Sequence, residues 1–284
     1  MRRIPLTMKY ILPVILLILS LDTYSQDLVV IDTARIKCSY VYQEVKDTIK
    51  NDKCDDLIYL QIGSRCSKSY SYYTFRFDSL VSSPKGMKEL NRLIAVMNSN
   101  WTDRSKLPPN DPFYRMSARV CKNYPQGAMT VTDFIIADHY LYEEDLNIQE
   151  WIMTEDSTKT VLGHECQMAT CRFRGRDWTA WFALDIPIND GPWKFCGLPG
   201  LIMEVYDRNK QQYFCINGMQ EVAPEPICFG TIGVKAKCFE KTTHSAFLKA
   251  RYDNLRGDDR HVQEQLGIPP SEHKYVPRFD YIER

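Results

Sequence analysis

The chain has 284 residues, of which 44% are hydrophobic, and its 36 basic residues balance its 36 acidic residues. This length is enough to bury the core of one large domain or two small ones. Because contacts with nucleic-acid phosphates need clustered Lys and Arg, the neutral balance argues against nucleic acid as the partner.

The N-terminal segment has the order of a secretory signal peptide. Arg2 and Arg3 precede an apolar run over residues 10–21, and a polar segment with small side chains follows. The apolar run is shorter than the roughly 20 residues that a membrane-spanning helix needs. We therefore predict a signal peptide over residues 1–25, cleaved after Ser25, and a periplasmic or secreted product that does not span the membrane.

All ten cysteines follow this segment. An even number of cysteines in an exported protein predicts disulfide bonds. Cys166 and Cys171 fall in one predicted strand, where steps of about 3.3 Å per residue place them too far apart to pair with each other. No Cys-x-x-Cys, other metal-ligand spacing or cofactor motif occurs, so we expect neither a metal nor a cofactor.

The first part of the mature chain alternates between apolar and polar residues. This pattern predicts strands over residues 34–45, 57–63 and 70–77. Residues 84–98 instead place apolar side chains on one helical face, behind a Ser83 that is typical of a helix start. We predict a helix there, packed on the sheet.

Further strands are expected along the rest of the chain, over residues 114–122, 128–137, 139–143, 151–153, 160–173, 178–186, 201–206 and 212–220. Gly175 lies between two of them and predicts a hairpin turn. A short helix is expected from Thr242 or Thr243 to about residue 255.

Many short strands joined by hairpins, with two helices, predict a mainly β (α+β) fold. We expect a curved antiparallel sheet with helices packed on it, in a single β-rich domain over residues 26–255. The charged segment over residues 256–284 is expected to be a mobile tail.

Residues 197–202 read GLPGLI, and other spaced elements accompany this hexapeptide in a block over residues 150–207. They include Gly163-His164-Glu165-Cys166, Phe173-Arg174-Gly175-Arg176, Ala180-Trp181-Phe182 and Gly191-Pro192-Trp193-Lys194-Phe195. On these residues the chain resembles the GLPGLI family of exported bacterial proteins, whose function is unassigned. The resemblance implies export and a single β-rich unit, but it assigns no catalytic residue.

The loop around this hexapeptide is the candidate binding segment. Its candidate residues are Gly191, Pro192, Trp193, Phe195, Gly197, Leu198, Pro199, Gly200, Leu201 and Ile202, with Trp181 on the strand before it. The interpretation we favour is structural: Gly191 and Gly200 permit unusual φ angles, Gly200 in a type II turn, and the large side chains fill the core. The alternative is a functional rim over a hydrophobic groove.

Two further alternatives concern charged residues. Arg174, Arg176 and Lys194 would form an anion-binding patch if the hairpin lay against the loop, although solvated hairpin charges are the reading we favour. His139 and His164 each precede acidic residues, which would suit a hydrolase with a His-carboxylate pair. No nucleophile elbow, zinc-protease motif or phosphate loop accompanies them. We therefore expect a non-enzymatic binding or accessory protein for an apolar ligand or an envelope partner.

Overall fold

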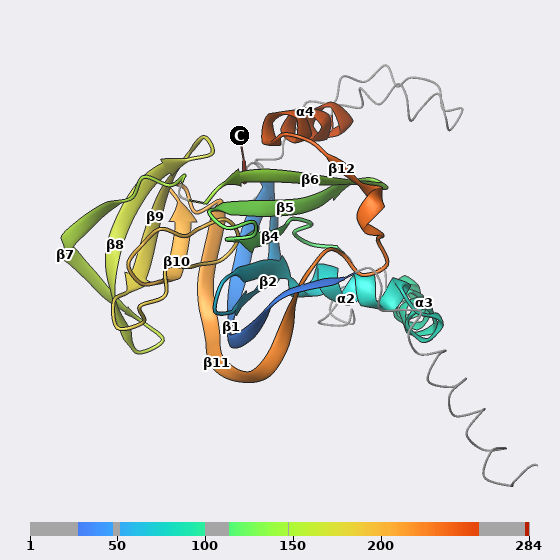
Figure 1. The fold of residues 1–284 in the computed structure, drawn as a ribbon, viewed down its shortest axis with the longest axis horizontal. Coiled ribbons are helices and arrows are strands. Elements are labelled where there is room, and N and C mark those ends of the chain that lie inside the picture. Colours follow the sequence, from blue (N-terminus) through green and yellow to red (C-terminus); the bar gives the residue numbers. More distant parts are fainter. Residues whose placement is uncertain (1–27, 48–51, 100–113, 147, 256–281, 284) are drawn as a thin grey trace, which may run out of the picture.

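The computed structural model describes residues 28–47, 52–99, 114–146, 148–255 and 282–283 (Figure 1). The predicted signal peptide and most of the predicted tail lie outside these residues. In the described part, twelve strands form one sheet in the order β12-β6-β5-β4-β3-β2-β1-β11-β10-β9-β8-β7. Among these residues, no helix is both long and apolar enough to cross a bilayer.

Most neighbouring strands pair as hairpins, as the sequence predicts, but β1 pairs with β11 from the other end of the described chain. Their bounds are β1 (Val29–Asp47), β2 (Asp52–Ile62), β3 (Ser67–Ser71), β4 (Arg119–Lys122), β5 (Ala128–Ile135), β6 (Asp138–Asp145), β7 (Ile152–Val161), β8 (His164–Phe173), β9 (Arg176–Ala183), β10 (Leu201–Asp207), β11 (Gln212–Phe229) and β12 (Phe239–Lys241). All neighbouring strands pair antiparallel except β12, which is parallel to β6. The prediction of a mainly β protein is confirmed.

The two longest strands, β1 and β11, hold the sheet together at its centre. They pair from Val29–Phe229 to Glu44–Gln212, with three register shifts along the way. Such irregularities bend a strand and increase its twist. Strands β7–β10 and strands β4–β6 lie on either side of this long pair (Figure 1).

Three α-helices are described: α2 (Tyr72–Val81), α3 (Pro84–Ser99) and α4 (His244–Leu255). The predicted helices over 84–98 and up to 255 are confirmed. The predicted strand over 70–77 is wrong, because a helix begins at Tyr72. Ser71 caps this helix, since its Oγ accepts a hydrogen bond from the Thr74 amide at 3.2 Å. The closely spaced aromatic residues of this segment resemble a strand pattern, so the cap is the more informative signal.

The predicted strand over 160–173 is also wrong at its start. Leu162 and Gly163 have φ angles of 49° and 85° and form a tight turn between β7 and β8. Two consecutive left-handed residues are typical of the hairpin turn that matches strand twist. Arg174 and Gly175 form the next turn with φ angles of 51° and 74°, as the glycine predicts. Of the predicted strand over 114–122, only β4 is a strand.

The structure joins no two of the ten cysteines in a disulfide, all of which lie in the described residues. The prediction of disulfide bonds is therefore not met. Cys38 and Cys171 are instead buried separately in the core, where burial raises the pKa of each thiol to about 12. A buried thiol of this kind packs as a small apolar side chain.

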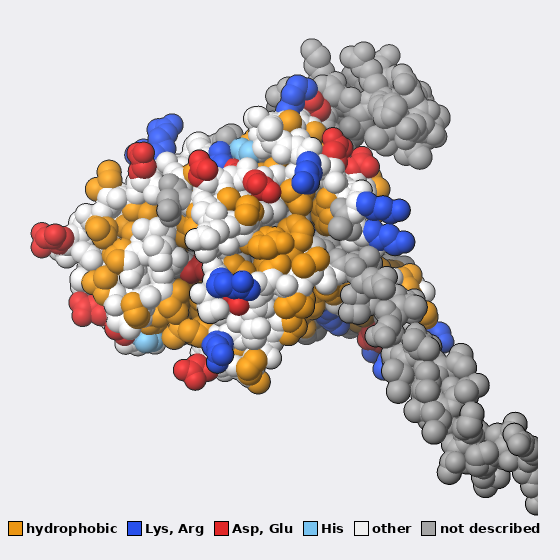
Figure 2. Space-filling model, viewed as in Figure 1, with side chains coloured by type: hydrophobic (Ala, Val, Ile, Leu, Met, Phe, Trp, Pro, Cys, Tyr) orange, Lys and Arg blue, Asp and Glu red, His pale blue; other side chains and the backbone are white. Residues whose placement is uncertain are grey.

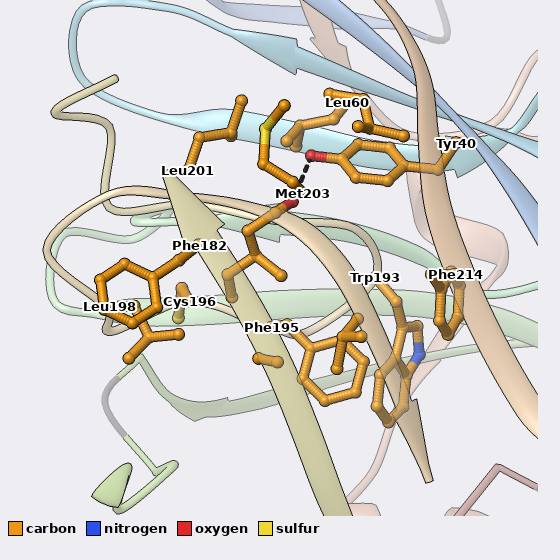
Figure 3. Packing of buried hydrophobic residues seen from close by; sticks show 14 of the residues in the cluster. Tyr40, Leu60, Phe182, Trp193, Phe195, Cys196, Leu198, Leu201, Met203 and Phe214 are labelled. Atoms are coloured by element: carbon orange, nitrogen blue, oxygen red, sulfur yellow. Dashed lines mark hydrogen bonds between the residues drawn. The ribbon is translucent and has the colours of Figure 1, made fainter. Parts of the chain in front are cut away.

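The main hydrophobic core lies inside the curved sheet. Phe182, Trp193, Phe195 and Phe214 pack there, and the Tyr40 hydroxyl donates to the Ile202 carbonyl at 2.9 Å (Figure 3). On the surface, basic and acidic side chains are interspersed rather than gathered by sign on the face that Figure 2 shows.

Candidate functional site

The loop between β9 and β10 enters the core instead of lying on the surface. Trp193, Phe195 and Leu198 are buried, and Figure 3 shows them among side chains of the surrounding strands. The amide of Trp193 donates to the Ser69 hydroxyl at 2.8 Å, which connects the loop to β3. The large side chains of the loop therefore pack as the structural interpretation expects.

The predicted reason for the glycines at positions 191 and 200, an unusual φ angle, is wrong. Gly200 does not have a left-handed φ; instead, a Cβ there would lie 1.9 Å from the Ala183 carbonyl oxygen. Gly191 is likewise pressed against Ile202, with a Cβ distance of 2.9 Å. The left-handed angle belongs to Gly197, with φ of 96°. Close approach of neighbouring atoms, not turn conformation, explains both glycines: the Ile202 side chain lies against Gly191, and the Ala183 backbone lies against Gly200.

A buried lysine on β4 holds this loop in place. The Nζ of Lys122 lies 2.5 Å from Asp190 Oδ1, 2.5 Å from the Gly191 carbonyl oxygen and 2.9 Å from the Phe195 carbonyl oxygen. The three donors of the ammonium group are therefore matched by three acceptors. Nothing in the local sequence around Lys122 indicates this role.

The remaining candidate residues have ordinary structural positions. Leu201 and Ile202 begin β10 and are buried, as is Pro192, whereas Pro199 is exposed. Trp181 is half-buried on β9, where its Nε1 donates to the Tyr206 hydroxyl at 3.4 Å. Of all these residues, only Trp193 reaches the cavity described below.

A cluster of buried charges lies beside the loop. The Nζ of Lys194 is 2.5 Å from Glu144 Oε2 and 2.5 Å from Glu283 Oε1. Arg174 also pairs with Glu144, and His244 Nε2 lies 3.2 Å from Glu283 Oε2. Glu283, which follows the undescribed residues 256–281, is therefore packed and not mobile.

Arg176 adds a further contact to the same segment. Its Nε donates to the Ile282 carbonyl oxygen at 3.1 Å, while its Nη1 pairs with Asp207 at 2.6 Å. The three basic residues that we expected to be solvated are thus all engaged inside the protein: Arg174, Arg176 and Lys194. The expectation of solvated charges is wrong, because residues 282 and 283 and internal carboxylates cover them.

The Glu283 carboxylate gives the cluster a pH dependence. Burial alone would raise its pKa, but the Lys194 ammonium and His244 outweigh burial and lower the pKa to about 2. We expect Glu283→Gln to lower the free energy of unfolding by about 2–3 kcal/mol at pH 7. A pKa below that of the unfolded chain means that this contribution is present above about pH 4.5 and is lost as the pH falls towards 2.

Urea unfolding of the unmodified protein and of Glu283→Gln between pH 3 and pH 7 measures the difference in their free energies of unfolding. This difference should become smaller as the pH falls. Glu89→Gln is the control, because the Glu89 side chain is 42% exposed and pairs with the exposed Arg92 on α3. A Glu283→Gln difference that is constant across the pH range would contradict the assignment.

A cavity of about 310 Å³ opens beside this cluster, between β1, β2, β5 and α4. Aromatic and aliphatic side chains form much of its wall: Tyr42, Tyr114, Met116, Phe134, Ile135, Ile136, Tyr142 and Trp193. Ligand sites in proteins begin at about this size and are lined mainly by such side chains. The cavity is therefore large enough for a small apolar group.

The charged groups in the cavity wall already have partners within the protein. Asp133 pairs with Arg251 at 2.8 Å, and Glu283 pairs with Lys194. Burial raises the pKa of Asp56 to about 6, even though its carboxylate accepts hydrogen bonds from the Met116 amide and the Ser71 hydroxyl. Asp133 and Glu283 are thus compensated internally, and the wall offers a ligand apolar surface beside a similar amount of polar surface.

The two histidines of the hydrolase alternative lie apart from this cavity. His164 Nδ1 is 2.7 Å from Asp185 Oδ2, but the Asp185 side chain is 58% exposed. His139 packs between Phe134 and Phe239, and burial lowers its pKa. Neither residue lines the cavity. Within the described ranges, no group of three or more His, Cys, Asp or Glu side chains is placed to hold a metal ion.

Two solved structures have a distant likeness to this chain. Two crystal structures of PNGF-II, in space groups C2 and P21, each superpose with a TM-score of 0.47 at 10% sequence identity. The alignment covers 78% of this chain and 34% of PNGF-II, so the chain spans about a third of that protein's length. No curated protein matches the sequence.

A family profile matches the segment that contains the hairpin, the loop and the hexapeptide. The match covers residues 174–204, and the family is described as a protein of unknown function (Porph_ging). These residues include Arg174, Lys194 and the Gly197–Ile202 hexapeptide. The resemblance to the GLPGLI family of unknown function is thereby confirmed for this segment of the chain.

Proposed function

We propose that this protein is an exported, non-enzymatic binding protein of the cell envelope, which accommodates an apolar group of a ligand or partner. The observation that supports this proposal is the cavity of about 310 Å³ with its aromatic and aliphatic wall. Tyr114 and Ile136, both partly exposed, stand at its rim. An apolar group that leaves water for such a wall gains about 25 cal/mol for each Å² buried.

The internal pairing of the charges favours an apolar group over a charged one. Asp133 with Arg251, and Glu283 with Lys194, are already neutralised as pairs. A charged ligand would have to compete with these contacts and would lose its own hydration. An acyl chain or aromatic group loses little hydration and needs no partner for a charge.

Blocking the cavity tests this proposal. We expect the neutral fluorophore 1-N-phenylnaphthylamine to bind the protein with a rise in fluorescence. Ala118 lines the cavity, and Ala118→Trp would fill part of it, so we expect affinity to fall by about tenfold or more. Ala128→Trp is the matched control, because Ala128 is also half-buried and is not part of the wall.

Thermal unfolding of both variants shows whether each remains folded. Absence of binding to the unmodified protein, or equal affinity of a folded Ala118→Trp variant, would refute the proposal.

The envelope location is tested separately. Fractionation of cells that produce the full chain should recover it outside the cytoplasm, with Gln26 as the first residue. Recovery from the cytoplasm with Met1 retained would refute export without affecting the cavity.

A further inference from the structure

Lys68 on β3 is a buried cation without a carboxylate partner among the residues the structure describes. It is 7% exposed, and its Nζ donates to the Cys228 carbonyl oxygen at 2.6 Å. The Tyr70 ring lies 5.5 Å away. An ammonium group has three donors, so one carbonyl leaves part of its hydrogen-bonding capacity unused.

Two other lysines that are buried in the described part of the chain differ in this respect. Lys122 pairs with Asp190, and Lys194 pairs with Glu144 and Glu283. A buried charge is costly unless an opposite charge or several hydrogen bonds compensate it. Among the described residues, Lys68 therefore lacks the carboxylate partner that Lys122 and Lys194 each have.

Lys68 lines a second cavity, of about 200 Å³, which lies apart from the one beside α4. Arg119 and Asp78 also line it and pair with each other. The Asp78 carboxylate accepts a further hydrogen bond from the Tyr114 hydroxyl at 3.2 Å. Asp78 is thus already engaged, and among the described lining residues the positive charge of Lys68 is left in excess.

A second polar group in the same wall is also incompletely bonded. Thr231 is 4% exposed, and its hydroxyl has no hydrogen-bond partner among the described residues. Buried polar groups usually have a partner, so an orphaned hydroxyl needs an explanation. Lys68 and Thr231 come from segments far apart in the chain, and both belong to this cavity.

The rest of the wall is largely apolar. Its members include Leu28, Tyr70, Phe75, Pro226 and Ile232. Phe75 is 39% exposed, so the cavity reaches the surface on that side. A site with one uncompensated ammonium and apolar walls suits an anion with an apolar body better than an inorganic anion.

We propose that this cavity is a binding site for a small organic carboxylate, such as a short acyl or aromatic acid. The Lys68 ammonium binds the carboxylate, and the Thr231 side chain supplies a hydroxyl. The side chains of Tyr70, Phe75 and Ile232 contact the apolar body of the acid. The inference is independent of the proposed function, because it concerns other residues and another cavity.

Calorimetric titration of the full chain tests the site. Benzoate and hexanoate are the probes, and benzamide is the uncharged analogue of benzoate. We expect both acids to bind and benzamide to bind at least about tenfold more weakly, because only the acids carry the charge that Lys68 lacks. Inorganic phosphate distinguishes a general anion site, and we expect it to bind more weakly than benzoate.

Lys68→Met is the decisive variant. Methionine is apolar and of similar length, and it removes a buried charge, so the variant should fold at least as well as the original protein. We expect it to lose benzoate affinity by about tenfold or more, and Thr231→Val to lose a smaller part. Lys37→Met is the control, since Lys37 pairs with Glu225 at 3.1 Å outside this cavity.

Three results would overturn the proposal. They are no binding of either acid at millimolar concentration, unchanged benzoate affinity in a folded Lys68→Met variant, and phosphate affinity equal to that for benzoate. The fluorophore test of the other cavity is unaffected by any of these outcomes, so the two proposals can fail separately.

Discussion

Lys122→Met is expected to lower the free energy of unfolding by about 3–5 kcal/mol. The substitution leaves the Asp190 carboxylate buried without its partner, and it leaves the carbonyl oxygens of Gly191 and Phe195 without a donor. The Lys122 side chain is 3% exposed, so water cannot replace the ammonium without opening the loop. Urea unfolding, followed by the fluorescence of buried Trp193, measures the loss.

Two comparisons separate the buried charge from other effects of the substitution. Lys37→Met removes a more exposed ion pair with Glu225 and should cost less than about 1 kcal/mol. Adding Asp190→Asn to Lys122→Met removes the uncompensated charge, so the double variant should recover about 1 kcal/mol or more of the loss. Equal losses for Lys122→Met and Lys37→Met would show that the loop does not depend on this pair.

The sequence predicts those parts of the fold whose signals are local. Ser83 ahead of an amphipathic segment predicts α3, and Ser83 Oγ accepts a hydrogen bond from the Gly86 amide at 3.1 Å. Gly175 predicts the hairpin between β8 and β9, because glycine readily adopts the left-handed φ angle that such a turn needs, here 74°. Over residues 70–77 the local signals conflict: the aromatic residues favour a strand, whereas Ser71 caps a helix, and the cap prevails.

The candidate site depends on contacts between residues far apart in the chain. Lys122 and Asp190 are 68 residues apart, and Lys194 and Glu283 are 89 apart. Local periodicity contains no information about such pairs, because the order of strands in the sheet brings them together. For the same reason, Arg174 and Arg176 read as solvated hairpin charges until the position of Ile282 and Glu283 is known.

The lysine on β3 shows a further limit of pattern reading. Lys68 lies between Ser67 and Ser69 in a strand whose residues are all buried. Alternation between polar and apolar residues predicts a strand with one face in water. A polar strand that is buried on both faces does not show this alternation, so the pattern does not identify it. A buried lysine becomes noticeable only when its surroundings are known.

Gly200→Ala is expected to lower the free energy of unfolding by about 3 kcal/mol or more, as overpacking of a rigid site does. The new Cβ would lie 1.9 Å from the Ala183 carbonyl oxygen and 2.7 Å from the Ala183 carbonyl carbon. Both atoms belong to the backbone, so no side-chain rotation relieves the clash. Leu201 also pairs with Ala183 in the sheet, and separation of the two backbones would disturb that pairing.

Two other glycines provide matched controls for this clash. At Gly218 a Cβ would meet only the Ser39 hydroxyl, at 3.0 Å, and that hydroxyl can rotate away, so Gly218→Ala should change stability little. At Gly163 a Cβ meets nothing within 4 Å, but φ is 85°, so Gly163→Ala should cost about 1 kcal/mol through backbone strain alone. If urea unfolding gives Gly200→Ala a loss no larger than that of Gly163→Ala, then the approach of Gly200 to β9 is not what requires a glycine in the hexapeptide. A loss of stability larger than that of both control variants would show that Gly200 is needed for the loop to pack against the sheet.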